Sequence, residues 1–474
     1  MDMQNLLLMR DEIVLTAILL LMLVAEIIIP QKHKKSLVHF GLILFLIYTI
    51  QSFFPQNTGE LFGGSYKTYA LAHFFKAVLA VGVMTILLQS VEWIEQKLLP
   101  YDFTAEFFIL IFSSLLGLNF MISAGDFLMF YLGLELSTMP IIALSAFDFY
   151  NHRSVEAGIK YVMLASVSSA ILLFGVSLIY ATTGSIYFEA ISGAMHLPLL
   201  EIIGLIMIFI GIGFKISLVP FHFWAADVYE GAPTVISNYL SVISKGAAVY
   251  VLMTLLFVTF TAFQKEWDYI MYGIAILTMF IGNLFALRQK NMKRFLAFSS
   301  VAQAGFILLA LLSHDELGVK AIIFFLLIYI FSNVAAFGVV HLISLKAGTE
   351  NMDDYNGLYQ TNPRLSLILM IALFSLAGIP PVAGFFAKFF LYSAAASKGY
   401  YLLVFIAVVN VTISLYYYLL PVRAAFLRKS ENPIPSIKSD FYSKISFIFI
   451  MVGLLVLGLY SGVLEYISQM SNIF

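Results

Sequence analysis

Residues 321–340 read AIIFFLLIYIFSNVAAFGVV and contain no charged side chain. A helix of this length is about 30 Å long, which is the thickness of the hydrocarbon core of a bilayer. Backbone polar groups find no water at that depth, so a spanning segment has to satisfy them within a helix or a closed barrel. The apolar run is continuous rather than alternating, and it therefore predicts a membrane-spanning helix instead of a barrel strand.

The rest of the 474-residue chain has the same character, since 61% of its residues are hydrophobic and only 11% are charged. An average soluble protein is about 45–50% apolar and about 25% charged, so a soluble enzyme is excluded. The net charge of −1 gives no support for binding nucleic acid. Apolar runs predict an all-α polytopic membrane protein with about fourteen spans. They lie near residues 11–29, 36–54, 69–94, 104–122, 125–147, 155–182, 200–224, 231–262, 268–286, 293–313, 319–347, 362–397, 401–428 and 441–467.

The loops between these spans indicate an orientation. Of the 26 Lys and Arg side chains, 17 lie on one side of the predicted membrane and five on the other. Loops rich in Lys and Arg face the cytoplasm, which predicts both termini on the outer side. The remaining four are lysines inside predicted spans, namely Lys76, Lys215, Lys245 and Lys388.

Charged groups at the centre of a bilayer cost about 2.5–3.5 kcal/mol each and usually serve a function. Lys76 lies near the start of its segment, and we expect its ammonium group to reach the membrane surface. Lys215, Lys245 and Lys388 lie deeper, as does Glu135. One glutamate cannot pair with three lysines. The residues themselves leave two interpretations open, a row that carries protons and a set of static ion pairs between helices.

Two of the predicted spans contain helix-breaking residues close to a buried lysine. The first stretch is FKISLVPFHFWAADVYEGAPT (214–234), which begins in the seventh predicted span, here called segment 7. The second is LAGIPPVAGFFAKFF (376–390), in the twelfth predicted span, here called segment 12. The breaking residues are Pro220 in the first and Gly378, Pro380 and Pro381 in the second. A simple kink explains one such proline, but two breaks beside buried charges are typical of a transport site.

A spacing of 160 residues relates Gly158-Ile159-Lys160 to Gly318-Val319-Lys320, and Pro220 to Pro380. The spacing predicts two five-helix repeats of inverted orientation, since each contains an odd number of spans. We therefore expect four parts. They are an N-terminal three-helix segment (1–100), a first repeat (101–262), a second repeat (263–428) and a C-terminal loop with one helix (429–474).

Two histidines lie inside predicted spans near other polar groups. His222 follows Pro220, and His341 lies near the end of segment 11. Histidine titrates near neutral pH, so both are candidates for a secondary proton path. The chain has no cysteine, which excludes disulfides and cysteine-bound zinc or iron–sulfur centres within it. Spacings typical of metal ligands or of a nucleotide-binding loop are also missing from the sequence.

Four stretches together resemble a known family. They are YLGLELSTMP (131–140), the 214–234 stretch, YLSVISKGAA (239–248) and LAGIPPVAGFFAK (376–388). The chain resembles the antiporter-like membrane subunits of respiratory complex I (NADH–quinone oxidoreductase) over nearly its whole length, and is closest to the subunit N branch. The resemblance implies a multi-pass protein of the bacterial inner membrane that works with the other membrane subunits of complex I, lipid, protons and internal water.

The resemblance also implies proton translocation coupled to the reduction of a quinone such as ubiquinone elsewhere in the complex. The enzyme is then a translocase whose FMN, iron–sulfur clusters and quinone lie in partner subunits, with no cofactor or redox centre in this chain. The implied proton track consists of Glu135, Lys215, Lys245 and Lys388. Glu135 modulates Lys215, Lys215 carries the proton, Lys245 relays it and Lys388 lies near the exit. Glu156 and Lys160 are implied as a secondary pair.

Three other functions remain open at this stage. An Mrp-type cation/proton antiporter subunit shares these motifs, and so does the membrane subunit of a related hydrogenase. The third alternative is a scaffold that holds other subunits without transporting ions.

Overall fold

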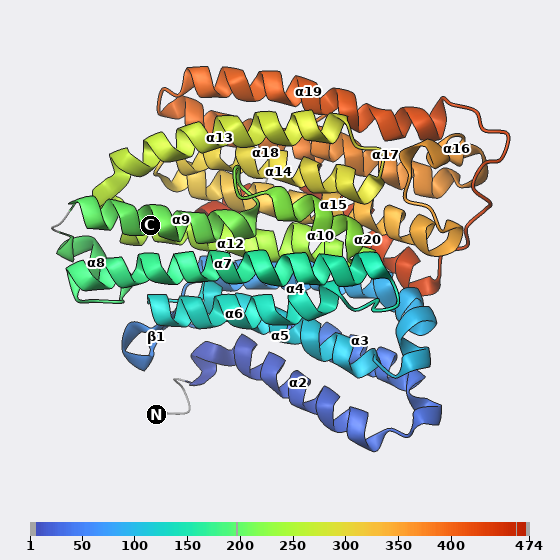
Figure 1. Ribbon diagram of the computed structural model, residues 1–474, viewed down its shortest axis with the longest axis horizontal. Coiled ribbons are helices and arrows are strands. Elements are labelled where there is room, and N and C mark those ends of the chain that lie inside the picture. The colour runs from blue at the N-terminus through green and yellow to red at the C-terminus, as the bar shows by residue number, and fades with distance from the viewer. Residues whose placement is uncertain (1–5, 196–197, 461, 471–474) are drawn as a thin grey trace. The chain divides into compact units, whose positions relative to one another are not determined.

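The computed structural model describes residues 6–195, 198–460 and 462–470. These residues fold almost entirely into helices, with one two-stranded hairpin (Figure 1). The chain forms two compact units: unit 1 comprises the described residues of 1–215 and 243–266, and unit 2 those of 216–242 and 267–472. The predicted first repeat thus contributes residues 216–242 to the second unit. The predicted four-part division and the inverted repeat therefore remain predictions.

Unit 1 holds most of the N-terminal half of the chain. Its helices are α2 (Arg10–Ile28), α3 (Lys35–Gln51), α4 (Ala70–Trp93), α5 (Thr104–Ile122), α6 (Phe127–Ser145), α7 (His152–Thr183), α8 (Phe188–Ala194), α9 (Pro198–Ile216) and α12 (Lys245–Thr254). Strands β1 (Gly59–Leu61) and β2 (Tyr66–Thr68) pair antiparallel, with Leu61 opposite Tyr66. Single π-helical turns at Ile94–Leu98 and Leu255–Thr259 extend α4 and α12.

The position of α6 is set by its close packing against α5. A Cβ atom at Gly117 of α5 would lie 2.3 Å from the backbone nitrogen of Ser137 on α6, so only glycine allows this approach. The hydroxyl of Ser114 also donates to the carbonyl of Ser137 at 2.8 Å. These contacts fix the part of α6 that carries Glu135 and its polar neighbours.

Unit 2 holds most of the C-terminal half. Its helices are α10 (Phe223–Gly231), α11 (Thr234–Tyr239), α13 (Gln264–Leu287), α14 (Met292–Leu311), α15 (Glu316–Ala347), α16 (Leu358–Thr361), α17 (Pro363–Ala377), α18 (Ala383–Ser397), α19 (Tyr401–Phe426), α20 (Phe441–Leu459) and α21 (Gly462–Met470).

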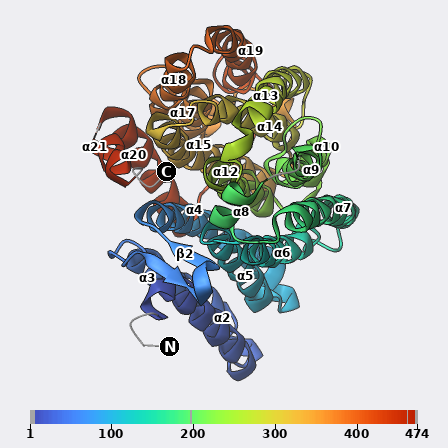
Figure 2. The same ribbon diagram turned by 90° about the vertical axis from the view of Figure 1, so that its left-hand side faces the viewer.

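Helix α15 lies at the centre of unit 2. It packs against α11, α14, α17, α18 and α20, and Figure 2 shows it surrounded by several of these helices. Its most apolar stretch is 100% buried, whereas that of α19 is 33% buried. Residues 321–340 thus belong to an internal helix, whose apolar side chains contact other helices of unit 2.

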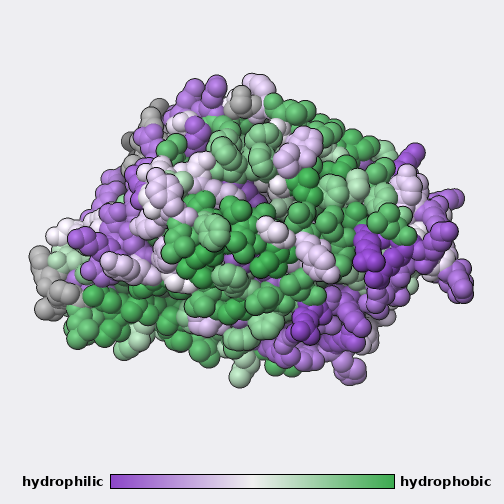
Figure 3. Space-filling model, turned by 90° about the horizontal axis from the view of Figure 1, so that it is seen from above, coloured by the Kyte–Doolittle hydropathy of each residue, from purple (hydrophilic) through white to green (hydrophobic). Residues whose placement is uncertain are grey.

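Eleven helices of the described residues are long and apolar enough to cross a membrane. Helices occupy all fourteen of the predicted segments, but α3 and α17 are shorter than the eleven, so the number of spans stays a prediction. Large apolar side chains are exposed on α2, α7, α19 and α20, as expected for surfaces that face lipid. On the face shown in Figure 3, hydrophobic residues form a broad middle region, and hydrophilic residues gather toward both the left-hand and the right-hand ends.

Both predicted helix breaks are present. Residues 217–222 separate α9 from α10, and residues 378–382 separate α17 from α18. The first gap contains Pro220, and the second contains Gly378, Pro380 and Pro381. The peptide bonds Val219–Pro220 and Pro380–Pro381 are cis.

Candidate functional site

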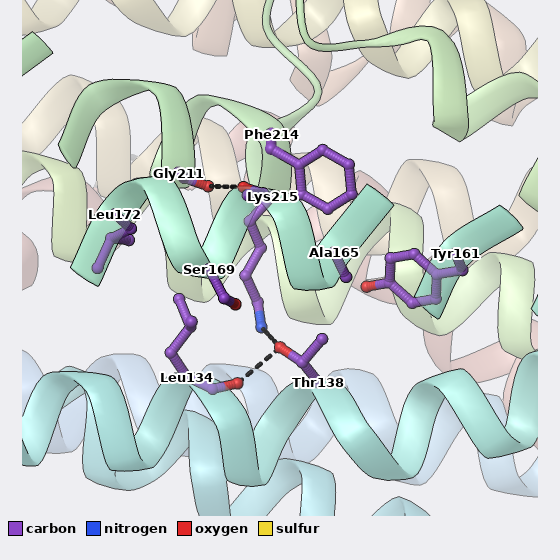
Figure 4. A pocket seen from close by; sticks show the side chains of 10 residues that line it. Leu134, Thr138, Tyr161, Ala165, Ser169, Leu172, Gly211, Phe214 and Lys215 are labelled. Carbon is purple, nitrogen blue, oxygen red and sulfur yellow. Dashed lines mark hydrogen bonds between the residues drawn. The ribbon is translucent and has the colours of Figure 1, made fainter. Parts of the chain in front are cut away.

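Lys215 is the second-last residue of α9, and its side chain is 6% exposed. Its Nζ donates to Ser137 Oγ at 2.6 Å and to Thr138 Oγ1 at 2.7 Å. Figure 4 shows this side chain extending from α9 toward Thr138 on α6. Hydroxyl groups, rather than a carboxylate, therefore receive the hydrogen bonds of this buried amine.

The two hydroxyls are themselves oriented by α6. Ser137 Oγ donates to the carbonyl of Leu134 at 2.8 Å, and Thr138 Oγ1 donates to the same carbonyl at 2.6 Å. Their protons are thus engaged, and each presents lone pairs to Lys215. An ammonium group carries three N–H donors, while a neutral amine carries two and a lone pair. Two acceptors satisfy the neutral amine and leave the ammonium one donor for a further partner, so this site accommodates lysine in both protonation states.

A small cavity of about 10 Å³ lies beside Lys215. Its walls come from α6, α7 and α9 and include Thr138, Tyr161 and Ser168. This is about the room that one water molecule needs, and the polar groups around it are suitable partners. The cavity can therefore supply the third acceptor that the ammonium form requires.

Glu135 lies on α6, two residues before Ser137, and its side chain is partly buried. It is hydrogen-bonded to Tyr131 one turn earlier, while its Oε1 atom is buried without a hydrogen-bond partner among the described residues. Within the same residues it forms no ion pair with Lys215. The two groups are near enough to interact electrostatically, although they are not joined by a hydrogen bond or an ion pair.

Lys245 is the first residue of α12 and is 1% exposed. A π-helical turn, Leu240–Ser244, immediately precedes it. Such turns occur often at functional sites because the wider turn changes the direction of the following side chain. A Cβ atom at the next residue, Gly246, would lie 3.7 Å from Phe75 and from Leu79, which places α12 against α4. The sequence analysis missed this irregular turn.

Lys388 lies on α18 and is 4% exposed. Its Nζ donates to the carbonyl of Ala377 at 3.2 Å and lies 4.8 Å from the centre of the Phe306 ring. Ala377 is the last residue of α17, so the amine contacts the negative end of the helix dipole at the break. Gly378 follows with a φ of 85°, and its missing side chain leaves space for Lys388. The break thereby provides both the carbonyl and the space.

A polar network surrounds Lys388 in unit 2. The Gln303 side chain donates to the carbonyl of Leu376 at 3.0 Å, and Ser332 Oγ donates to Ser375 Oγ at 2.7 Å. These side chains line a second cavity of about 10 Å³ next to Lys388. The sequence analysis missed this network, although a glutamine and serines inside apolar runs are a usable signal for it.

The proposed secondary residues occupy different environments. His222 is buried directly before α10, with its ring centre 6.2 Å from that of Phe285. His341 is buried in α15, and its Nε2 has no hydrogen-bond partner among the described residues. Glu156 and Lys160 form an exposed ion pair of 2.7 Å along α7. None of these four residues lines the cavity beside Lys215.

Each unit thus brings together part of the predicted set. Unit 1 contains Glu135, Lys215 and Lys245, whereas Lys388 and both histidines lie in unit 2. The described residues include no group of three or more His, Asp or Glu side chains arranged to hold a metal ion. The roles assigned to these residues remain predictions.

The expectation for Lys76 was wrong. It is 2% exposed and pairs with Glu12, which is 1% exposed. The Tyr66 hydroxyl donates to the other oxygen of Glu12 at 2.9 Å, and Asp11 beside it contacts His73 Nδ1 at 2.9 Å. A lysine with a buried carboxylate at hydrogen-bond distance gains nothing by extending to the surface. The sequence analysis considered neither acid because both lie at the start of their predicted span.

Comparison with known proteins places this geometry in a family. A family model described as NADH:quinone oxidoreductase/Mrp antiporter matches residues 124–414. Subunit N of NADH-quinone oxidoreductase from Phocaeicola vulgatus is 45% identical over 99% of both chains, and that from Desulforamulus reducens is 37% identical over 98% of both.

Solved structures agree. A chain of respiratory complex I from Thermus thermophilus has a TM-score of 0.81 at 28% identity, with 96% of this chain and 98% of that chain covered. A chain of the Mrp complex from a Dietzia species has a TM-score of 0.83 at 21% identity over 99% and 97%, which shows the shared fold alone. This chain therefore belongs to the NADH:quinone oxidoreductase/Mrp antiporter family of membrane subunits, on its subunit N branch.

Proposed function

We propose that this chain moves protons across the membrane as a subunit of a proton-translocating NADH–quinone oxidoreductase. Glu135, Lys215, Lys245 and Lys388 form its proton track, and quinone reduction in other subunits drives it. The iron–sulfur clusters belong to those partners, since this chain has no cysteine to ligate a cluster, and we assign the flavin and the quinone to the same partners. The chain lies in a bacterial inner membrane with both termini on the outer side, as its loop charges favour.

The observation that carries this proposal is the environment of Lys215. Its buried Nζ is held by two oriented hydroxyl acceptors rather than by a carboxylate. A static structural lysine would gain most from a permanent ion pair, whereas this arrangement suits a group that gains and loses a proton. Lys388 is likewise held by an uncharged acceptor, the carbonyl of Ala377 at the end of a helix. A cavity about the size of one water molecule lies next to it.

The driving step is a change in the Glu135–Lys215 interaction. In the present arrangement the two groups are not paired, and Oε1 of Glu135 is buried without a hydrogen-bond partner. A charge change in a neighbouring subunit brings them together or apart. Pairing retains the proton on Lys215, and separation releases it toward Lys245 and then Lys388. Removing one partner from a buried pair costs about 3–5 kcal/mol. Moving one charge against 100 mV needs about 2.3 kcal/mol, so one such change suffices.

The test uses membranes that contain the assembled complex with Lys215→Ala or Glu135→Ala. We expect NADH-dependent acidification to fall to a small fraction of the wild-type rate while native gels show the complex intact. Lys265→Ala is the matched control, because Lys265 is an exposed lysine of the same unit. Near-normal coupled activity in both variants would reject the assigned roles.

The same membranes distinguish the main rival function. An Mrp-type cation/proton antiporter exchanges sodium for protons without any electron donor. We expect acidification to depend on NADH and to be unaffected when potassium replaces sodium. Sodium-driven proton movement in the absence of NADH would support the antiporter instead.

A further inference from the structure

A groove opens between the start of α17, the segment before α20, and the first turns of α20. Its volume is about 470 Å³, which is within the usual range for a ligand site. All of its walls belong to unit 2. In Figure 1 the chain between α19 and α20 runs down the right-hand side of the view, past α16. None of the proposed proton-track residues lines this groove.

Side-chain hydrogen bonds hold the walls of the groove in place. Asn362, at the start of α17, donates to the carbonyls of Ile434 and Pro435 at 3.3 and 3.0 Å and accepts from the Ile437 N–H at 2.7 Å. Asp440 caps α20 by accepting from the N–H groups of its first turn at 3.0 and 3.2 Å. Both ends of the connecting segment are thereby fixed, so the groove is built before any ligand arrives.

Three cations line this groove: Arg364, Lys438 and Lys444. All three are exposed, and none forms an ion pair or side-chain hydrogen bond with another described residue. No acidic side chain is among the residues that line the groove. Arg294 of the same unit, by contrast, pairs with Asp227 at 2.7 Å and with Glu230 at 2.9 Å. The lining of the groove thus carries three positive charges and no negative one, and the Asp440 carboxylate in the adjoining turn accepts backbone N–H groups.

Apolar side chains form the other part of the groove. Ile368 lies one turn further along α17 than Arg364, and Phe447 and Ile448 lie one turn further along α20 than Lys444. Charged groups therefore meet the groove at the helix starts, and apolar groups continue it toward the middle of the helices. A soluble anion has no use for the apolar part, whereas a phospholipid places its phosphate and its acyl chains in this order.

We propose that this groove binds an anionic glycerophospholipid. Its phosphate lies among Arg364, Lys438 and Lys444, and its acyl chains lie along Ile368 and Ile448. The helix starts belong to the side with most loop cations, so the lipid is one of the leaflet that we predict to face the cytoplasm. Basic grooves between spanning helices on that side are suited to acidic head groups. The proposal is independent of the proton track.

The test measures binding of phosphatidylglycerol to the purified, delipidated complex by native mass spectrometry. The triple variant Arg364→Gln, Lys438→Gln, Lys444→Gln removes the head-group contacts. We expect a loss of affinity of roughly 100-fold at one lipid site, since each Lys or Arg near the membrane surface contributes a factor of about five. The matched control is Arg288→Gln, Lys290→Gln, Lys429→Gln, which removes the same charge from exposed positions outside the groove and should bind as the wild type does.

Further arms separate a lipid from a free phosphate. Zwitterionic phosphatidylcholine should bind at least tenfold more weakly than phosphatidylglycerol, and millimolar inorganic phosphate should not displace the lipid. Ile448→Gln should weaken the binding of the lipid, although all three cations remain in place. In the unaltered complex, affinity should fall as salt rises. Unchanged binding in the triple variant, or displacement by phosphate, would overturn the proposal.

Discussion

The buried pair between Lys76 and Glu12 gives the sharpest stability prediction. Both side chains are at most 2% exposed, so neither charge is solvated by water when its partner is removed. Lys76→Met leaves the Glu12 carboxylate without its cation, and Glu12→Gln leaves the Lys76 ammonium without its paired carboxylate. Breaking a buried pair in this way costs about 3–5 kcal/mol. We therefore expect each single variant to be strongly destabilised.

A second argument bounds these costs, because an unpaired charge can be neutralised instead. For groups with ordinary pKa values of about 4.3 and 10.4, neutralisation at pH 7 costs about 3.7 kcal/mol for a glutamate and about 4.6 kcal/mol for a lysine. Glu12→Gln should thus be the more harmful change by about 1 kcal/mol. Because protonation of the remaining carboxylate becomes easier in acid, the defect of Lys76→Met should shrink toward about 2.3 kcal/mol at pH 6.

The double variant Lys76→Met, Glu12→Gln removes both charges and should be more stable than either single variant. The assay heats the purified complex in detergent at pH 6 and at pH 7. Unfolding is measured as the loss of this subunit from the soluble fraction. Lys35→Met is the control, since Lys35 is 60% exposed in its pair with Glu95 and such pairs are worth at most about 1 kcal/mol. Additive losses in the double variant would refute the reasoning.

Two other changes probe the proton track. Ser137→Ala with Thr138→Val removes both hydroxyl acceptors of Lys215, and each hydrogen bond to a charged donor is worth about 1.5–3 kcal/mol. We expect NADH-driven acidification to fall at least tenfold in an assembled complex. Retention of the normal rate would contradict this expectation. Gly378→Ala places a Cβ atom 3.0 Å from the Lys388 side chain, at a residue with a φ of 85°. We expect a destabilisation of about 1–3 kcal/mol, measured by thermal unfolding, and slower acidification in the same preparation. An unaltered protein in both assays would show that Lys388 does not depend on this space.

The comparison of sequence and structure is clearest at the helix breaks. Pro220 lacks an N–H donor and clashes with the preceding turn, and the gap between α9 and α10 agrees with that local chemistry. Proline alone does not decide a break, since α6 and α19 continue through Pro140 and Pro421. The same reasoning predicted the gap at Gly378, Pro380 and Pro381. The partners of the lysine beside the first gap could not be predicted. Ser137 and Thr138 reach Lys215 only because α6 packs against α9.

Lys76 illustrates the opposite case. Its place in the sequence, near the start of an apolar run, suggested a side chain that reaches the membrane surface. Its true partner is 64 residues away in α2, and the hairpin adds Tyr66 to the same cluster. No local pattern encodes a pairing between distant helices, so the expected environment was wrong although the helix itself was right.

The sequence by itself determined that this chain is a bundle of apolar helices with broken segments beside buried lysines, because hydrophobic length and proline chemistry act locally. Only the tertiary structure decided which groups surround each amine: two hydroxyls for Lys215, a helix-terminal carbonyl for Lys388 and a carboxylate for Lys76. A buried charge is stabilised by whatever the neighbouring helices bring within about 3 Å, and that depends on how the helices pack.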